Sequence, residues 1–281
     1  MLRQSPRIGL AMPTILRRSS GWPPLHLQEL WTYRELLYFL VWRDLKVRYK
    51  QTVLGVAWAV LQPLMATIVF SVFFGRLAGI ASDGVPYPVF NLAGLVPWGF
   101  FAFGLNEAAN SVVGSRQLIT KVYFPRLAIP LATVLVGLVD LAVGFLLLLT
   151  AMILYGITPS VRAFMVLPFI LLAFTASLGA GLWLAALNVR YRDVRYVLPF
   201  LTQMWLFTTP IVYPSSLVPP AWRTVQGLNP MVGVVDGFRW ALFGAQARSS
   251  TIAMSTVVAL ALASGGAFYF RRTERAFADI V

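Results

Sequence analysis

Long apolar stretches alternate with short basic segments along this chain. No Asp, Glu, Lys or Arg occurs in residues 51–75, 84–106, 163–189, 196–222 or 249–270, and residues 127–161 carry only Asp140. A helix crosses a membrane with about 20 apolar residues at about 1.5 Å of rise each. The pattern therefore predicts an all-α membrane protein with six transmembrane helices, near residues 55–75, 89–109, 128–155, 163–187, 197–213 and 251–270.

Two further segments are apolar but do not fit a span. Residues 27–50 combine the apolar run 36–42 with polar residues at helical spacing, which predicts an amphipathic interfacial helix at the membrane surface. Between the fifth and sixth spans, several prolines precede the apolar piece 230–243, whose roughly 14 residues are too few to cross. We expect a re-entrant segment on the outer side there.

Composition and charge location set the topology. Apolar residues make up 58% and charged residues 12% of the 281 residues, whereas soluble domains carry about 25% charged residues. The net charge of +13 does not indicate nucleic acid, because most Lys and Arg residues cluster on one side, in segments 1–50, 111–127, 188–196 and 271–281. The positive-inside rule makes these segments cytoplasmic. Both termini then lie inside, the number of spans is even, and residues 1–26 form a flexible basic cytoplasmic tail.

Missing residue types exclude several kinds of chemistry. The chain has no cysteine and one histidine, His26 in the tail, which excludes thiolate metal sites and imidazole catalysis inside the membrane. No lysine follows a glycine, so the chain holds no Walker-type ATP loop. An intramembrane glycosyl- or acyltransferase would need paired acids or a histidine in the membrane. The predicted spans hold neither, so this class of enzyme is disfavoured. A pure scaffold without transport is equally disfavoured.

Buried polar and small residues in the spans favour helix packing. Asp140 is a poor proton relay because no His or Lys lies near it, so an interhelical hydrogen bond is the favoured role and ion-coupled transport is disfavoured. The other candidate acid is Glu107, near the inner end of the second span. Small residues at 177–181 and 264–266 allow close approach of two helices.

The positive-inside rule explains the charges of two basic loops but not their apolar side chains. Residues 115–125 and 187–196 mix charges with aromatic and aliphatic side chains, which need a surface to cover them. A docked cytosolic partner is the simple candidate. Aromatic clusters in the spans have two interpretations, namely interfacial belts and lipid-facing packing, or a ring-lined passage for a sliding sugar polymer.

Four segments carry a family likeness. They are VWRDLKVRYKQTVLGVAWAVLQPL at 41–64, LITKVYFPRLAIPL at 118–131, LNVRYRDVRYVLPFLTQMWLFTTPIVYP at 187–214 and LNPMVGVVDGFRWAL at 228–242. In this order they resemble the type-2 ABC transporter permeases of bacterial surface polysaccharide export, the family of O-antigen, teichoic acid and capsule exporters. The likeness covers about residues 35–275.

The resemblance implies a six-span permease domain over residues 27–281 in the bacterial inner membrane. Such a permease is not an enzyme. It forms a homodimer and binds two copies of a separate ABC ATPase subunit, which holds ATP and Mg. Its cargo is a polyprenyl-diphosphate-linked glycan, which moves outward through a passage formed by the two copies. Membrane lipids are further partners. Export of a small lipid or drug by the same fold is the alternative.

The resemblance and the charge pattern together assign roles to individual residues. The expected ATPase coupling residues are Ser115, Leu118, Lys121, Tyr123, Phe124, Arg190, Arg192 and Tyr196. The basic residues expected to contact the lipid diphosphate at the inner rim are Arg43, Lys46, Arg48 and Lys50. Spans one and five should line the passage with Trp58, Phe70, Phe73, Phe74, Trp205, Phe207 and Tyr213.

Overall fold

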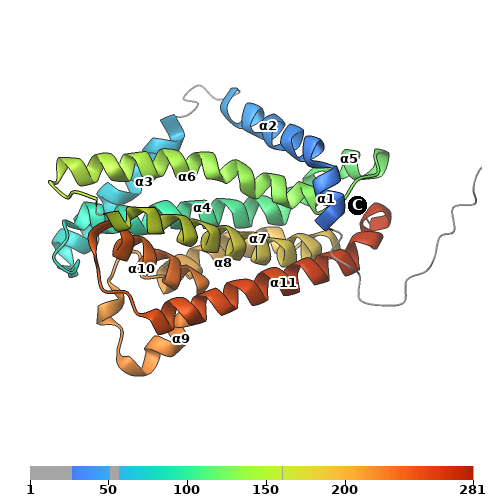
Figure 1. Cartoon of the computed structure of the whole chain (residues 1–281). Coiled ribbons are helices and arrows are strands. Elements are labelled where there is room, and N and C mark those ends of the chain that lie inside the picture. Colours follow the sequence, from blue (N-terminus) through green and yellow to red (C-terminus); the bar gives the residue numbers. More distant parts are fainter. Residues whose placement is uncertain (1–26, 51–56, 160, 281) are drawn as a thin grey trace, which may run out of the picture.

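The protein is a bundle of helices that run lengthwise between two ends (Figure 1). The computed structural model describes residues 27–50, 57–159 and 161–280, and these residues contain no strand. The α-helices are α1 Leu27–Thr32, α2 Arg34–Lys50, α3 Ala57–Phe70, α4 Tyr87–Gly114, α5 Arg116–Lys121, α6 Ala128–Leu154, α7 Val166–Arg190, α8 Val194–Thr208, α9 Arg223–Gly227, α10 Pro230–Phe243 and α11 Ser249–Ile280. The all-α prediction is confirmed for the described residues.

Within the described residues, five helical segments are long and apolar enough to cross a membrane. They are Ala57–Leu77, which joins α3 to a π-helical turn, then α4, α6, Val161–Arg190 and Ser249–Glu274. They coincide with five of the six predicted spans. The first two residues of the first predicted span and the predicted tail 1–26 lie outside the described residues.

The helix at the fifth predicted span is shorter than expected. α8 has 15 residues, and at about 1.5 Å each these reach roughly 22 Å. The helix ends at Thr208, and residues 209–214 are not helical. The chain therefore leaves regular structure where the hydropathy pattern predicts that a helix continues to residue 213.

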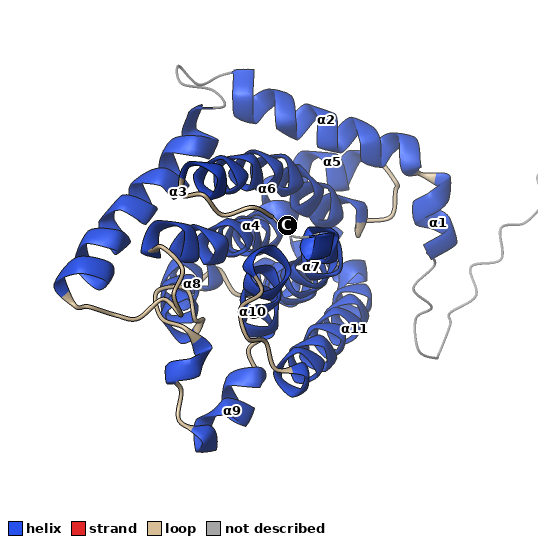
Figure 2. Cartoon of the chain, turned by 60° about the vertical axis from the view of Figure 1, so that its left-hand side comes forward, coloured by secondary structure: helices blue, strands red, loops and turns tan. Residues whose placement is uncertain are grey.

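α4 is the central helix of the bundle. It packs against α6, α7 and α10, and Figure 2 shows these neighbours around it. In its most apolar stretch 78% of the residues are buried, against 6% for the segment that contains α3. α3 and α8 both lie at the edge of the bundle and pack on α4. One side of each helix packs on the core, and the apolar side chains on the other side are exposed.

The segment before the first span is helical, as predicted, with α1 and α2 divided at Tyr33. Leu40 is buried and packs in a cluster with Ile119 and Phe270. On the other side Tyr38 and Phe39 are exposed. Apolar residues thus occupy both faces of α2, whereas an amphipathic helix confines them to one.

α7 and α11 approach each other backbone to backbone. A Cβ atom placed on Gly179 would lie 2.5 Å from the amide nitrogen of Ala263, and one on Gly266 would overlap the Gly179 carbonyl oxygen. Backbone atoms cannot move aside as a flexible side chain does. The close approach expected from the small residues is confirmed at this pair.

Gly179→Ala should therefore destabilise the protein by about 1–3 kcal/mol, as overpacking of a tight core contact does. The measurement is the melting temperature of the detergent-solubilised protein. The matched control is Gly99→Ala, because a Cβ atom at Gly99 meets nothing within 4 Å. Equal melting temperatures for the two variants would contradict the backbone contact.

Candidate functional site

The bundle has two functional ends, named here by their short helices. The α5 end contains α1, α5, residues 191–193 and the last turns of α11, and the α9 end contains residues 78–86, α9 and residues 244–248 (Figure 1). α4 runs through the core between the two ends. Among the described residues, no group of three His, Asp or Glu side chains could hold a metal ion.

At the α5 end, α5 presents one buried and one exposed face. Ile119 and Phe124 are each 5% exposed and pack in the cluster with Phe270 and Phe277. Tyr123, by contrast, is 89% exposed. Ser115 and Leu118 are partly buried and Lys121 is exposed. Phe124 therefore supports α5 from inside, whereas Tyr123 is free to touch a partner.

The loop after α7 adds a second exposed patch at the same end. Arg190, Arg192 and Tyr196 are all exposed, and Tyr196 reaches 83%. The Arg190 guanidinium lies 5.5 Å from the ring centre of Tyr191. This surface combines positive charge with aromatic rings, and it fits a partner that offers carboxylates and an apolar pocket.

Asp140 ties α6 to the end of α2. Arg48 Nη2 donates a 2.6 Å hydrogen bond to Asp140 Oδ2, and the Tyr49 hydroxyl donates to Asp140 Oδ1. Burial and this bond to Asp140 raise the pKa of Tyr49 to about 12, so the hydroxyl keeps its proton at neutral pH. The Arg48 guanidinium also lies 4.2 Å from the ring centre of Phe103. The expected interhelical hydrogen bond of Asp140 is confirmed.

The four basic residues assigned to the inner rim therefore differ in their surroundings. Arg48 is paired with Asp140, and Arg43 is paired with Asp44 at 2.8 Å. Lys46 lies over the Trp42 ring and is exposed, as is Lys50. The two lysines are thus the charges of this set that remain open to an external phosphate.

A cavity of about 230 Å³ lies beside the Arg48–Asp140 pair. α3 contributes Gln62 and Ala66 to its wall, and α4 contributes Trp98 and Phe103. The cavity is therefore bordered by the first predicted span and by the central helix. The polar groups of Arg48, Asp140 and Gln62 face an otherwise apolar space.

The aromatic residues assigned to the passage fall into two groups. Trp58, Phe73 and Phe207 are exposed at the edge of the bundle. The others are turned inward, namely Phe70, Phe74, Trp205 and Tyr213. Among these, Trp205 packs edge to face on Phe101 and donates a 2.8 Å hydrogen bond to Asn229 Oδ1. Trp205 therefore anchors α8 to α10 in this conformation.

At the α9 end, Arg239 of α10 is buried, at 2% exposure, and holds three segments together. Its guanidinium donates hydrogen bonds to the carbonyl oxygens of Phe90 on α4 and of Pro210 and Ile211 after α8, at 2.6–3.3 Å. The break after α8 leaves the Pro210 and Ile211 carbonyls without helical partners, and the arginine supplies them, whereas the Phe90 carbonyl lies inside α4. Sequence reasoning assigned no role to Arg239, although a charge inside a short apolar helix is a signal for one.

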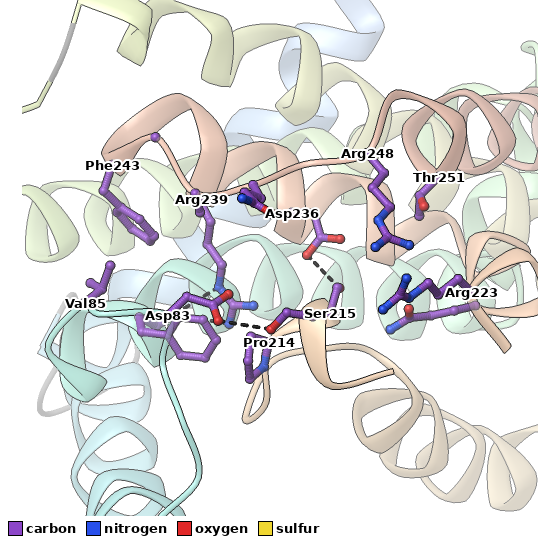
Figure 3. A pocket seen from close by; sticks show the side chains of 16 residues that line it. Asp83, Val85, Pro214, Ser215, Arg223, Asp236, Arg239, Phe243, Arg248 and Thr251 are labelled. Atoms are coloured by element: carbon purple, nitrogen blue, oxygen red, sulfur yellow. Dashed lines mark hydrogen bonds between the residues drawn. The ribbon is translucent and has the colours of Figure 1, made fainter. Parts of the chain in front are cut away.

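Asp236 lies one turn before Arg239 and accepts a 2.9 Å hydrogen bond from the Ser215 hydroxyl. Burial raises the pKa of Asp236 to about 6, although Arg239 and Ser215 oppose the shift. Figure 3 shows both side chains reaching from α10 toward the segment around Pro214. α10 is thereby fixed on the chain that follows α8.

Comparison with known proteins agrees with this arrangement. Residues 35–243 match the family described as ABC-2 type transporter. The chain is 32% identical to the O-antigen export system permease protein RfbA of Myxococcus xanthus over 76% of this chain and 82% of the relative. It is 26% identical to the protein of that name from Klebsiella pneumoniae, over 88% and 95%. It is 27% identical to the polysialic acid transport protein KpsM of Escherichia coli, over 83% and 91%.

Arg239→Met should unfold or strongly destabilise the α9 end. Each buried carbonyl left without a donor costs about 1–3 kcal/mol, and the Pro210 and Ile211 carbonyls lose theirs. The measurement is the folded fraction and melting temperature in detergent. The control is Arg76→Met, because Arg76 is exposed and makes no hydrogen bond within the described residues. A melting temperature of Arg239→Met equal to that of the control would show that the carbonyls do not need the guanidinium.

Proposed function

Because this chain belongs to the ABC-2 type transporter family, we propose that it is the membrane permease of an ATP-driven exporter of lipid-linked polysaccharide. The observation that carries the proposal is the similarity, over most of the chain, to relatives named for O-antigen export and polysialic acid transport. The protein is a multi-pass membrane protein and a transport subunit. The glycan leaves the cytoplasm on a polyprenyl diphosphate and emerges on the outer side of the bacterial inner membrane.

The α5 end is the proposed docking surface for two ATPase subunits. These subunits bind ATP and Mg, because this chain has no Gly-Lys loop of the Walker type. Tyr123, Arg192 and Tyr196 are its exposed contacts. α5 packs on α4 and α11, so a displacement of α5 acts directly on two long helices. The basic character of this end also favours a cytoplasmic location, with both termini inside.

The edge helices α3 and α8 are the proposed contact with a second copy of the chain. Phe200, Met204 and Phe207 form one exposed stripe along α8, spaced four and three residues apart. Trp58 and Met65 are exposed on α3. Two copies joined along these helices enclose a passage with aromatic and aliphatic walls, in which rings contact the C–H faces of sugars without holding charged groups.

The span count follows from the same arrangement. α8 and the non-helical residues 209–213 together form the fifth crossing, so six crossings bring both termini to one side. α9 and α10 then form a re-entrant pair on the outer side. Non-helical backbone at membrane depth needs partners inside the protein, and Arg239 provides them for this segment.

The end of α2 is the proposed loading site for the diphosphate, and its bonds to Asp140 place it beside the middle of α6 and not at the inner rim expected from the sequence. Lys46 and Lys50 are exposed at the end of α2, next to the first span. Exposed lysines attract a diphosphate through charge and hydrogen bonds. Arg48 keeps α2 on α6 through Asp140 and so holds the two lysines in place.

Tyr123→Ala should weaken ATPase docking. An exposed aromatic residue at the centre of an interface contributes about 2 kcal/mol, or roughly thirtyfold in affinity. The measurement is co-purification of the ATPase with the tagged permease. The control is Tyr155→Ala, an exposed tyrosine close to the other end of the bundle. Undiminished co-purification with Tyr123→Ala would remove the α5 end as the docking surface.

Deletion of this chain tests the export function itself. We expect the cell's lipid-linked glycan to be trapped inside, visible by immunolabelling only after permeabilisation, and to return to the surface when the chain is re-expressed. Glycan that stays at the surface without the chain would overturn the proposal. Export of a small lipid would then be the function to test, by stimulation of ATP hydrolysis with candidate lipids.

A further inference from the structure

A cavity of about 400 Å³ opens at the α9 end (Figure 3). Its walls come from the loop before α4, residues 214–216, α9, α10 and residues 244–248. Its volume falls within the range of about 300–1,000 Å³ that is typical of small-ligand sites. A second cavity of about 260 Å³ shares Arg223, Arg248 and Thr251 with the first. The two arginines therefore lie where two spaces meet.

The charges in the cavity do not balance internally. Arg239 is engaged by backbone carbonyls, and the Asp236 carboxylate offsets its charge. Asp83 accepts a 3.0 Å hydrogen bond from Ser216. Against these two carboxylates stand three guanidinium groups, so the lining carries one excess positive charge. Besides Arg239, the arginines are Arg223 and Arg248. Within the described part of the chain neither forms an ion pair, and Arg223 uses only its Nε, toward the Val218 carbonyl at 2.7 Å.

A neutral donor completes the set. The Gln226 Nε2 is buried and has no hydrogen-bond partner among the described residues, and Gln226 lines the cavity next to Arg223. A buried amide donor without a partner is costly, and native proteins rarely leave one empty. Phe90 and Phe243 supply apolar wall on the other side. Because Nε2 is closed to solvent, the Gln226 side chain has to turn before a ligand in the cavity can accept its hydrogen bond.

We propose that this cavity binds an oxyanion, a carboxylate or phosphate group, on a sugar-sized ligand. Guanidinium groups bind both anions through paired, charge-assisted hydrogen bonds. Asp83 and Asp236 offer acceptors for sugar hydroxyls. The proposed export function supplies one source, an acidic sugar unit of the emerging glycan, and on that source the inference rests on the proposed function. The phosphate of a lipid headgroup is the other source of the same chemistry.

Arginine footprinting on the unmodified chain tests the proposal. The full chain in an uncharged, phosphate-free polyoxyethylene detergent is treated with a dicarbonyl reagent, and modification of each arginine is followed by mass spectrometry. Glucuronate and glucose 6-phosphate should slow modification of Arg223 and Arg248 severalfold, whereas glucose should not. Arg76 is the internal control, because it is exposed and does not line the cavity. The assay contains no ATP and no transport step, so its failure leaves the proposed export function intact.

A variant and the addition of a lipid distinguish a sugar oxyanion from a lipid phosphate as the ligand. Arg248→Gln should weaken glucuronate protection of Arg223 about tenfold, while Arg76→Gln leaves it unchanged. Protection that appears only when phosphatidylglycerol is added to the detergent supports the oxyanion site and assigns it to a lipid phosphate. No protection by any anion overturns the proposal. Equal protection by glucose also overturns it, because binding would then not depend on the charge.

Discussion

The need to give every buried backbone carbonyl a donor explains how the α9 end is built. α8 stops short of a full crossing, and the chain returns through α10. The carbonyls of Pro210 and Ile211 are left outside any helix, and the Arg239 guanidinium binds both, together with the Phe90 carbonyl of α4. One charged side chain thus permits an irregular segment next to the central helix. The cavity with Arg223 and Arg248 lies beside this segment, and residues 214–216 form part of its wall.

The same helices connect the two ends of the protein. α4 passes through the core from the α9 end to the α5 end, and both α5 and α10 pack on it. α11 also contacts both α5 and α10. A partner that moves α5 therefore acts on helices that reach the cavity at the α9 end and the edge helix α8. The two packed long helices α4 and α11 therefore carry the proposed coupling between the ATPase docking surface and the α9 end.

Hydropathy predicted the parts of this fold that depend on length and apolar content. It identified five crossing helices, the helix before them and the interhelical role of Asp140. It could not tell which face of an apolar helix meets lipid and which meets protein, since both surroundings are equally apolar. Phe124 was assigned to ATPase coupling and Trp205 to the passage lining; Phe124 is buried in a cluster with Phe270, and Trp205 is partly buried against Phe101. The role of Arg239 depends on the helix break after Thr208, which the uncharged run through residue 222 does not reveal.

The central claim is that the exposed stripe of α8 lines a water-filled passage between two copies and does not face lipid. The chain has no native cysteine, so a single introduced thiol reports on one position. Met204→Cys on the stripe and Leu171→Cys on the exposed side of α7 are the matched pair. A water-soluble maleimide added to membranes with assembled, ATP-driven transporter should label Met204→Cys and leave Leu171→Cys unreacted. Labelling of Leu171→Cys alone, or of neither, would contradict the passage along α8.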